Sequence, residues 1–252
     1  MREKIYTIPV NDAFLSADEC PFCWLERETE QKVINFTLGP TASYMEPDVR
    51  SATNCAGFCG VHLKKMYDFG NALGNALILQ TYMDDLLEEL RKEIQDFQMP
   101  PKRSIFGKKT EQEESTLLSW AREKQDSCYV CDKIEYNMAR YYETMFYLLK
   151  EPEFRKRLKN CKGFCMRHFL RILEEAKKFL PNEHREWFYE TLFSLMKENM
   201  DRVKGDLDWF IAKFDYRNAG ADWKNSKDAV SRTMQKLQGL HPADPVFRSE
   251  PR

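Results

Sequence analysis

Cysteine and histidine are the residues of this sequence whose spacing points most directly to chemistry. Cys20 and Cys23 form one Cys-x-x-Cys pair, and Cys128 and Cys131 form a second. Each pair is followed by a Gly-Phe-Cys-x-x-His motif, the first ending at His62 and the second at His168. Thiolate sulfur and imidazole nitrogen are preferred ligands of zinc, which takes four of them in a tetrahedron. The sequence therefore predicts metal binding.

The two sets of motifs belong to an internal repeat. The first half reads Cys20-Pro21-Phe22-Cys23, Glu46-Pro47-Asp48-Val49-Arg50 and Asn54-Cys55-Ala56-Gly57-Phe58-Cys59-Gly60-Val61-His62. The second half reads Cys128-Tyr129-Val130-Cys131, Glu151-Pro152-Glu153-Phe154-Arg155 and Asn160-Cys161-Lys162-Gly163-Phe164-Cys165-Met166-Arg167-His168. All eight cysteines lie within this repeat. Because a repeat of this kind indicates a duplicated supersecondary unit, we expect two similar halves.

The spacing within each half predicts one zinc ion per half, or two Zn²⁺ per chain. A Cys-x-x-Cys pair supplies two thiolates from one tight turn. A cysteine and a histidine three residues apart at the start of a helix share one face, and Gly57 and Gly163 give the chain freedom to turn just before them. The predicted ligand sets are Cys20, Cys23, Cys59 and His62 for the first ion, and Cys128, Cys131, Cys165 and His168 for the second.

Each half also contains a fifth candidate ligand, Cys55 or Cys161. We leave these two out of the zinc sets because both precede the glycine turn. The alternative sets drop the histidine and keep four cysteines, and such sets suit an iron–sulfur cluster.

The elements that position these motifs are expected to be helices. Helical patterns follow the Cys-x-x-Cys pairs at about residues 22–37 and 129–149, and each ends before a polar segment that opens with Glu-Pro. A long pattern covers 59–97, weakened in its middle by Gly70 and Gly74, and others cover 163–180, 183–217 and 225–238. No segment alternates as a strand would. The predicted fold is an all-α, duplicated helical bundle with one metal site per half.

The repeat also predicts the domain organisation. We expect a first helical repeat at residues 1–97, a linker at 98–114, a second repeat with C-terminal helices at 115–240, and a tail at 241–252. The linker assignment rests on a polar stretch that holds Pro100, Pro101 and Gly107.

Composition excludes several classes of function. The formal net charge is -1, whereas a generic nucleic-acid binder carries a basic excess. No signal-peptide pattern follows Met1, and no apolar run reaches the roughly 18 residues of a membrane span. We therefore expect a cytoplasmic protein, in which clustered thiols bind metal or do redox chemistry rather than form disulfides.

Two further segments have a structural and a functional interpretation. Glu46-Pro47-Asp48 and Glu151-Pro152-Glu153 could be catalytic carboxylate pairs, but their recurrence favours a turn held by Arg50 or Arg155. The polar segment at residues 215–228, which includes Tyr216, Arg217 and Trp223, could bind a ligand. We favour a corner between two helices for this segment.

The motifs together resemble the DUF6062 family, a bacterial family of unknown function. The similarity rests on the Cys-x-x-Cys and Gly-Phe-Cys-x-x-His motifs, on residues 45–50, and on Lys213-Phe214-Asp215-Tyr216-Arg217-Asn218 and Asn225-Ser226-Lys227-Asp228-Ala229 near the C-terminus. It covers nearly the whole chain. The resemblance implies that the positions of Cys55 and Cys161 are often not cysteine, and it implies no activity.

Two hypotheses for the function follow. The first is a binding or scaffold protein, in which closed zinc sites stabilise helices that face a protein or small-molecule partner. The second is an enzyme, in which a zinc-bound thiolate, Cys55 or Cys161 does thiol redox or alkyl-transfer chemistry. The sequence shows no general base or phosphate loop beside these motifs, which favours the first hypothesis.

Overall fold

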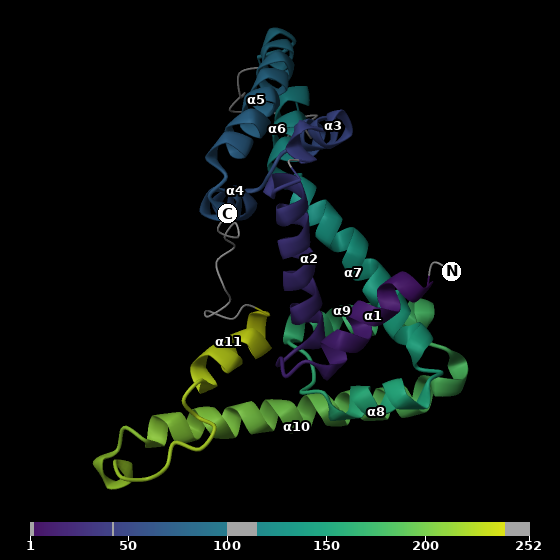
Figure 1. The fold of residues 1–252 in the computed structure, drawn as a ribbon, viewed down its shortest axis with the longest axis vertical. Helices are drawn as coiled ribbons and strands as arrows, with labels where there is room; N and C mark the ends of the chain where they lie inside the picture. The colour runs from purple at the N-terminus through teal and green to yellow at the C-terminus, as the bar shows by residue number, and fades with distance from the viewer. Residues whose placement is uncertain (1–2, 42, 100–114, 240–252) are drawn as a thin grey trace, which may run out of the picture. The chain divides into compact units, whose positions relative to one another are not determined.

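The computed structural model describes residues 3–41, 43–99 and 115–239 (Figure 1). Within these ranges the chain is helical and has no strand, so the all-α prediction is confirmed. The α-helices are α1 (Glu3–Leu15), α2 (Pro21–Leu38), α3 (Pro47–Ala56), α4 (Gly60–Phe69), α5 (Ala72–Gln95), α6 (Thr116–Asp126), α7 (Tyr129–Leu148), α8 (Pro152–Asn160), α9 (Met166–Phe179), α10 (Arg185–Ala212) and α11 (Ala229–Gln238). Three short 3₁₀ helices are η1 (Ser43–Met45), η2 (Asn182–His184) and η3 (Tyr216–Asn218).

Several helix boundaries differ from the predicted ones for local reasons. The pattern at 59–97 forms two helices, because Gly70 adopts a left-handed conformation with φ 88° and Asn71 caps α5 through a bond from the Gly74 amide. The Glu-Pro pairs were interpreted as breaks before polar segments. Pro47 and Pro152 instead begin α3 and α8, since proline suits the first position of a helix. Helices α1 and α6 were not predicted from the sequence pattern.

The described chain forms two compact units. The first comprises residues 3–29 and 135–239, and the second comprises residues 30–41, 43–99 and 115–134. The boundaries fall inside α2 and α7, so each of these helices begins in one unit and ends in the other. The units therefore differ from the predicted domains at 1–97 and 115–240. Most of the predicted linker, and all of the tail at 241–252, lie outside the described residues.

The core of the first unit is an aromatic cluster around the Cys20–Cys23 pair. Phe22 is fully buried, stacks on Tyr142 with ring centroids 4.2 Å apart, and also contacts Phe14 and Phe164. Helix α11 packs on α9 and α10 in this unit (Figure 1). Phe22, one of the two residues between the cysteines, thus anchors the start of α2 in the core.

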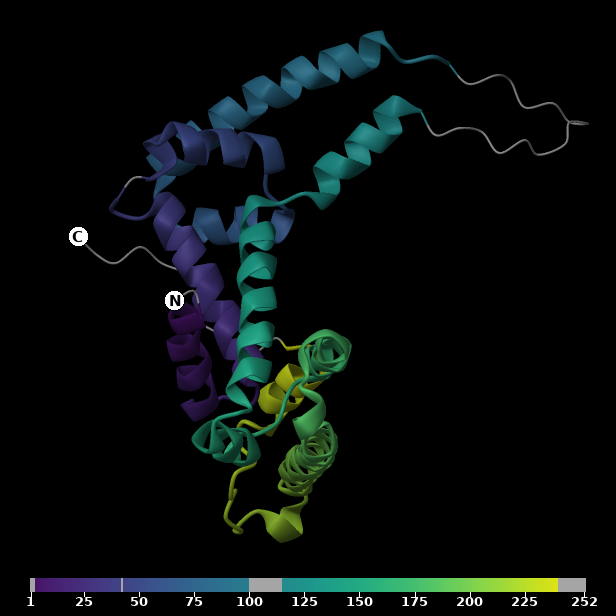
Figure 2. The same ribbon diagram turned by 90° about the vertical axis from the view of Figure 1, so that its right-hand side faces the viewer.

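The core of the second unit contains the other Cys-x-x-Cys pair. Cys128, Tyr129 and Val130 are buried against Ile34 and Leu38 of α2, and against residues of α4 and α5. Helices α5 and α6 contact each other and run alongside each other (Figure 2). The N-terminus of α7 is therefore buried in the second core, as the N-terminus of α2 is in the first.

Candidate metal centre

All eight predicted ligands lie in two groups, one in each unit. In the first unit Cys20 and Cys23, at the start of α2, meet Cys165 and His168, at the start of α9. We name this group the α2–α9 cluster. In the second unit Cys59 and His62 of α4 meet Cys128 and Cys131 of α7. We name this group the α4–α7 cluster.

This grouping differs from the predicted one. The spacing in the sequence predicts that each Cys-x-x-Cys binds with the Gly-Phe-Cys-x-x-His motif of its own half. The structure instead brings Cys20 and Cys23 to the motif of the second half, and Cys128 and Cys131 to the motif of the first half. The physical reason is the length of α2, whose 18 residues span about 27 Å at 1.5 Å per residue. At its far end, Ile34 and Leu38 share a core with Cys59.

In the α2–α9 cluster, His168 Nδ1 lies close to all three sulfurs. This nitrogen lies 3.4 Å from Cys20 Sγ, 3.4 Å from Cys23 Sγ and 3.3 Å from Cys165 Sγ. The sulfurs of Cys23 and Cys165 are 3.6 Å apart. In the α4–α7 cluster, His62 Nδ1 lies 3.2 Å from Cys59 Sγ, 3.3 Å from Cys128 Sγ and 3.4 Å from Cys131 Sγ.

These distances match the edges of a tetrahedron around a single metal ion. Zinc–sulfur bonds of about 2.3 Å and zinc–nitrogen bonds of about 2.0 Å imply S···S edges of roughly 3.8 Å and S···N edges of roughly 3.5 Å. The observed S···S separations are 3.6 Å for Cys23 and Cys165 and 3.9 Å for Cys59 and Cys131. In each cluster all four ligand atoms lie within 4.8 Å of one another. Both clusters could hold a metal ion.

Each cluster joins two helix N-termini. Cys59 and Cys165 are the N-caps of α4 and α9, while Cys20 and Cys128 directly precede α2 and α7. The predicted glycine turns are present, with Gly57 at φ 60° and Gly163 at φ 77°. Such φ values favour glycine. The positive ends of the helix dipoles stabilise thiolates at these positions.

A glutamate of α2 contacts the second ring nitrogen of each histidine. Glu30 Oε1 lies 2.9 Å from His62 Nε2, and Lys65 Nζ donates to the same carboxylate over 2.6 Å. In the other unit Glu26 Oε2 lies 3.5 Å from His168 Nε2 and is paired with Arg167. Such carboxylates fix the ring orientation and the tautomer of a metal-binding histidine. Neither glutamate was among the predicted site residues, although the two lie one turn apart on the helix after Cys23.

Without a metal ion, ligands in both clusters have pKa values that differ strongly from their ordinary values. Burial opposes a charged His62, but hydrogen bonds with Cys128 and Glu30 raise the pKa of His62 to about 10. Burial also opposes the Cys128 thiolate, but its bond with His62 lowers the pKa of Cys128 to about 6. Bonds from Cys20 and Cys23 hold the pKa of Cys165 far below its ordinary value. A metal ion bound in the α4–α7 cluster would have to displace the proton that His62 holds at neutral pH.

Helix α11 covers the α2–α9 cluster. Lys236, which is only 1% exposed, donates to the backbone carbonyls of Glu19 and Lys162, the residues that precede Cys20 and Gly163. Gly239 ends α11 at φ 80°, and a Cβ there would lie 3.3 Å from Cys165 Sγ. One buried lysine therefore ties together the two chain segments that carry the ligands.

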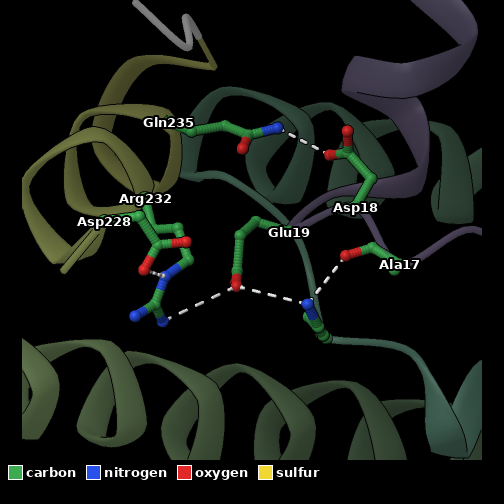
Figure 3. Close-up of a pocket in the computed structure, with 7 residues that line it drawn as sticks. Ala17, Asp18, Glu19, Asp228, Arg232 and Gln235 are labelled. Carbon is green, nitrogen blue, oxygen red and sulfur yellow. Dashed lines mark hydrogen bonds and ion pairs between the residues drawn. The ribbon is translucent and has the colours of Figure 1, made fainter. Parts of the chain in front are cut away.

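A polar cavity of about 290 Å³ lies beside these segments (Figure 3). Glu19 projects into it and is 3% exposed. Its Oε1 lies 3.8 Å from Lys162 Nζ and 3.9 Å from Arg232 Nη1. Its Oε2 pairs with Arg202 and, at 3.3 Å, with Lys236. This ion-pair network further attaches α11 to the start of α2.

The two clusters differ in their exposure to solvent. Cys20, Cys23, Cys165 and His168 are all buried. In the α4–α7 cluster Cys128 and His62 are buried, Cys59 is half-buried and Cys131 is exposed. The solvent-facing edge of the second cluster therefore consists of two sulfurs.

Cys55 and Cys161 lie outside both clusters. Cys55 is exposed on α3, and Cys161 is a buried C-cap of α8 whose pKa burial raises to about 12. Both groups therefore contain three cysteines and one histidine, as the predicted sets do. The all-cysteine alternative has no counterpart in this geometry.

The two Glu-Pro segments begin helices, and their arginines contact backbone rather than carboxylate. Arg50 Nε donates to the Tyr44 carbonyl over 3.1 Å, and Arg155 Nη1 donates to the Leu149 carbonyl over 2.7 Å. These contacts hold the chain that enters α3 and α8. The predicted turn is therefore the start of a helix, and each arginine contacts a backbone carbonyl in place of a carboxylate.

The polar segment after α10 forms a corner. Arg217 pairs with Asp215, Lys213 Nζ donates to the carbonyls of Asn218 and Ala219, and Trp223 packs on Phe210 and Phe214. These contacts are local, as the corner interpretation predicts. Among the described helices none is long and apolar enough to span a membrane.

Comparison with known proteins agrees with the resemblance seen in the motifs. The chain is 24% identical over 203 residues to an uncharacterized 23.9 kDa protein in the xynA 3' region of Caldicellulosiruptor sp. (strain Rt8B.4), a match that covers 80% of this chain and 85% of that protein. No solved structure matches the chain. The model of the DUF6062 family matches residues 1–244. The chain therefore belongs to DUF6062, a family of unknown function.

Proposed function

We propose that each cluster binds one zinc ion and that the protein is a helical binding or scaffold protein built around two structural zinc sites. The observation that carries this proposal is the tetrahedral spacing of three sulfurs and one Nδ1 in both clusters. Three thiolates and one imidazole form a recurrent structural zinc site. The glutamate on each Nε2 further supports it, because it leaves Nδ1 free to bind metal.

A structural role follows from the number of ligands. Four protein ligands complete the preferred coordination of zinc and leave no open position for a substrate, whereas catalytic sites keep one. Zinc bound in each cluster would neutralise thiolates that otherwise repel one another. It would hold the start of α2 to α9 in one unit and the start of α4 to α7 in the other. Helices fixed in this way can present their surfaces to a protein or small-molecule partner.

Elemental analysis of protein purified without oxygen tests the proposal. We expect two zinc ions per chain, and two again in a Cys55→Ser variant, because Cys55 lies outside both clusters. The double variant Cys20→Ser/Cys165→Ser should keep one zinc, since both residues belong to the α2–α9 cluster. Cys20→Ser/Cys59→Ser should keep none, because it damages both clusters.

Each contrary result has a defined meaning. Iron with acid-labile sulfide, or no metal, would show that the clusters are not zinc sites. If Cys20→Ser/Cys59→Ser kept one zinc and Cys20→Ser/Cys165→Ser kept none, each Cys-x-x-Cys would bind with the histidine motif of its own half. The two double variants remove the same number of thiols, so each serves as the control for the other.

A further inference from the structure

The two clusters differ in solvent exposure, and this difference makes the sulfurs of the second unit more accessible to oxidation than those of the first. Zinc-bound thiolates remain nucleophiles, and oxidation of cysteine follows thiolate character together with exposure. The α2–α9 sulfurs are buried and lie under α11, with Gly239 directly against Cys165. Cys131 is exposed, and its neighbour Cys59 is half-buried. Access to an oxidant therefore differs between two sites with the same ligand set.

We propose that the α4–α7 cluster is a peroxide-reactive zinc site, in which hydrogen peroxide oxidises Cys131 and Cys59 to a disulfide and one zinc ion is released. This inference rests on the proposed zinc binding. The reacting pair is defined by geometry, because the two sulfurs are 3.9 Å apart on the solvent-facing edge of the cluster. The remaining ligands, Cys128 and His62, are buried.

The reaction takes place at sulfur in two steps. The Cys131 thiolate attacks one peroxide oxygen, so that an S–O bond forms, the O–O bond breaks, hydroxide leaves and a sulfenic acid remains. The Cys59 thiolate then attacks the Cys131 sulfur, an S–S bond forms, the S–O bond breaks and a second hydroxide leaves. Two thiolates lose two electrons and one peroxide gains them. Two protons from the buffer convert the hydroxides to water.

Loss of the metal follows from the number of ligands that remain. A disulfide sulfur is no longer a thiolate, and the thiolate is the form of cysteine that binds metal. After oxidation only Cys128 and His62 remain, which is too few for a stable zinc site. The two sulfurs need to approach from 3.9 Å to about 2.05 Å, a small movement for side chains at the starts of two helices. The α2–α9 cluster would keep its ion.

The test adds hydrogen peroxide to the zinc-loaded full-length chain and follows released zinc with a chromogenic chelator. The zinc content before addition tests the proposed function by itself. We expect one equivalent to be released at least about tenfold faster than the second, in line with the dependence of oxidation on exposure. Peptide mapping of the fast product should show a Cys59–Cys131 disulfide with Cys20, Cys23 and Cys165 reduced. Thiol reductant with added zinc should restore two ions.

Cys55→Ser is the matched control, because Cys55 is an exposed thiol outside both clusters. The fast release should persist unchanged in this variant. A fast phase that disappears with Cys55 would overturn the assignment of Cys59 as the second thiol. Release of both ions at one rate, or first oxidation of Cys20, Cys23 or Cys165, would overturn the proposal while leaving zinc binding intact.

Discussion

At the scale of single residues, the two histidines are the most constrained members of the clusters. Each places Nδ1 within 3.4 Å of three sulfurs and directs Nε2 towards a glutamate of α2. The two contacts are unequal. Glu30 lies 2.9 Å from His62, whereas Glu26 lies 3.5 Å from His168 and is bound mainly by Arg167. Orientation of the ring by its carboxylate should therefore matter more in the α4–α7 cluster.

Replacing these glutamates separately tests that difference. Glu30→Gln should weaken zinc binding at the α4–α7 cluster by about 10- to 100-fold, the usual cost of losing such a partner. Glu26→Gln should affect only the α2–α9 cluster and to a smaller extent. Competition with a chelator of known affinity measures both binding constants in each variant. Equal weakening of both sites by either change, or none by Glu30→Gln, would contradict the assigned contacts.

At the scale of elements, the sequence pattern predicted the position of α11 correctly. It did not predict that α11 contacts the segments that carry the metal ligands. A helix at about 225–238 was predicted, and α11 spans Ala229–Gln238. Its attachment to the segments that carry the metal ligands depends on the hydrogen bonds of Lys236. From sequence alone, a lysine among polar residues is expected to have a solvated side chain. Only the packed structure shows that this side chain is buried and that burial lowers its pKa.

Lys236→Met should reduce the stability of the first unit. The methionine keeps most of the side-chain length but lacks the ammonium that donates hydrogen bonds to the carbonyls of Glu19 and Lys162. Each buried polar group left without a partner costs about 1–3 kcal/mol. Urea unfolding of the zinc-loaded protein measures the loss. Lys197→Met, on the exposed face of α10, is the control. Similar urea midpoints of unfolding for the two variants would show that the Lys236 hydrogen bonds do not stabilise the first unit.

At the scale of the whole molecule, the repeat identified all the ligands but not their grouping. Two Cys-x-x-Cys pairs and two Gly-Phe-Cys-x-x-His motifs can combine in two ways, and both ways give sets of three cysteines and one histidine. Ligand chemistry therefore does not distinguish the two groupings. The paths of α2 and α7 decide, because each begins in one unit and ends in the other. Whether a run of residues such as 22–37 stays straight, and which core receives its far end, depends on packing between segments distant in sequence.

Acid should remove zinc from the protein, and the direction follows from the protonation of the ligands. Zinc binding needs neutral histidine and ionised cysteine. In the metal-free α4–α7 cluster the pKa of His62 is raised to about 10 and that of Cys131 lies above its ordinary value, so both groups hold protons at pH 7. Binding must displace these protons. Affinity should therefore rise by about tenfold per pH unit for each proton displaced.

The metal-free chain should respond to pH in the opposite direction. The raised pKa of His62 means that its contribution to stability is fully present below its ordinary value of 6.5 and is lost as pH rises through about 10. Chelator competition between pH 6 and 8, together with thermal unfolding of the metal-free chain over a wider range, separates the two effects. Zinc affinity that does not change with pH would mean that the cluster binds metal without releasing protons, which contradicts the hydrogen-bonded thiolate–imidazolium arrangement of Cys128 and His62.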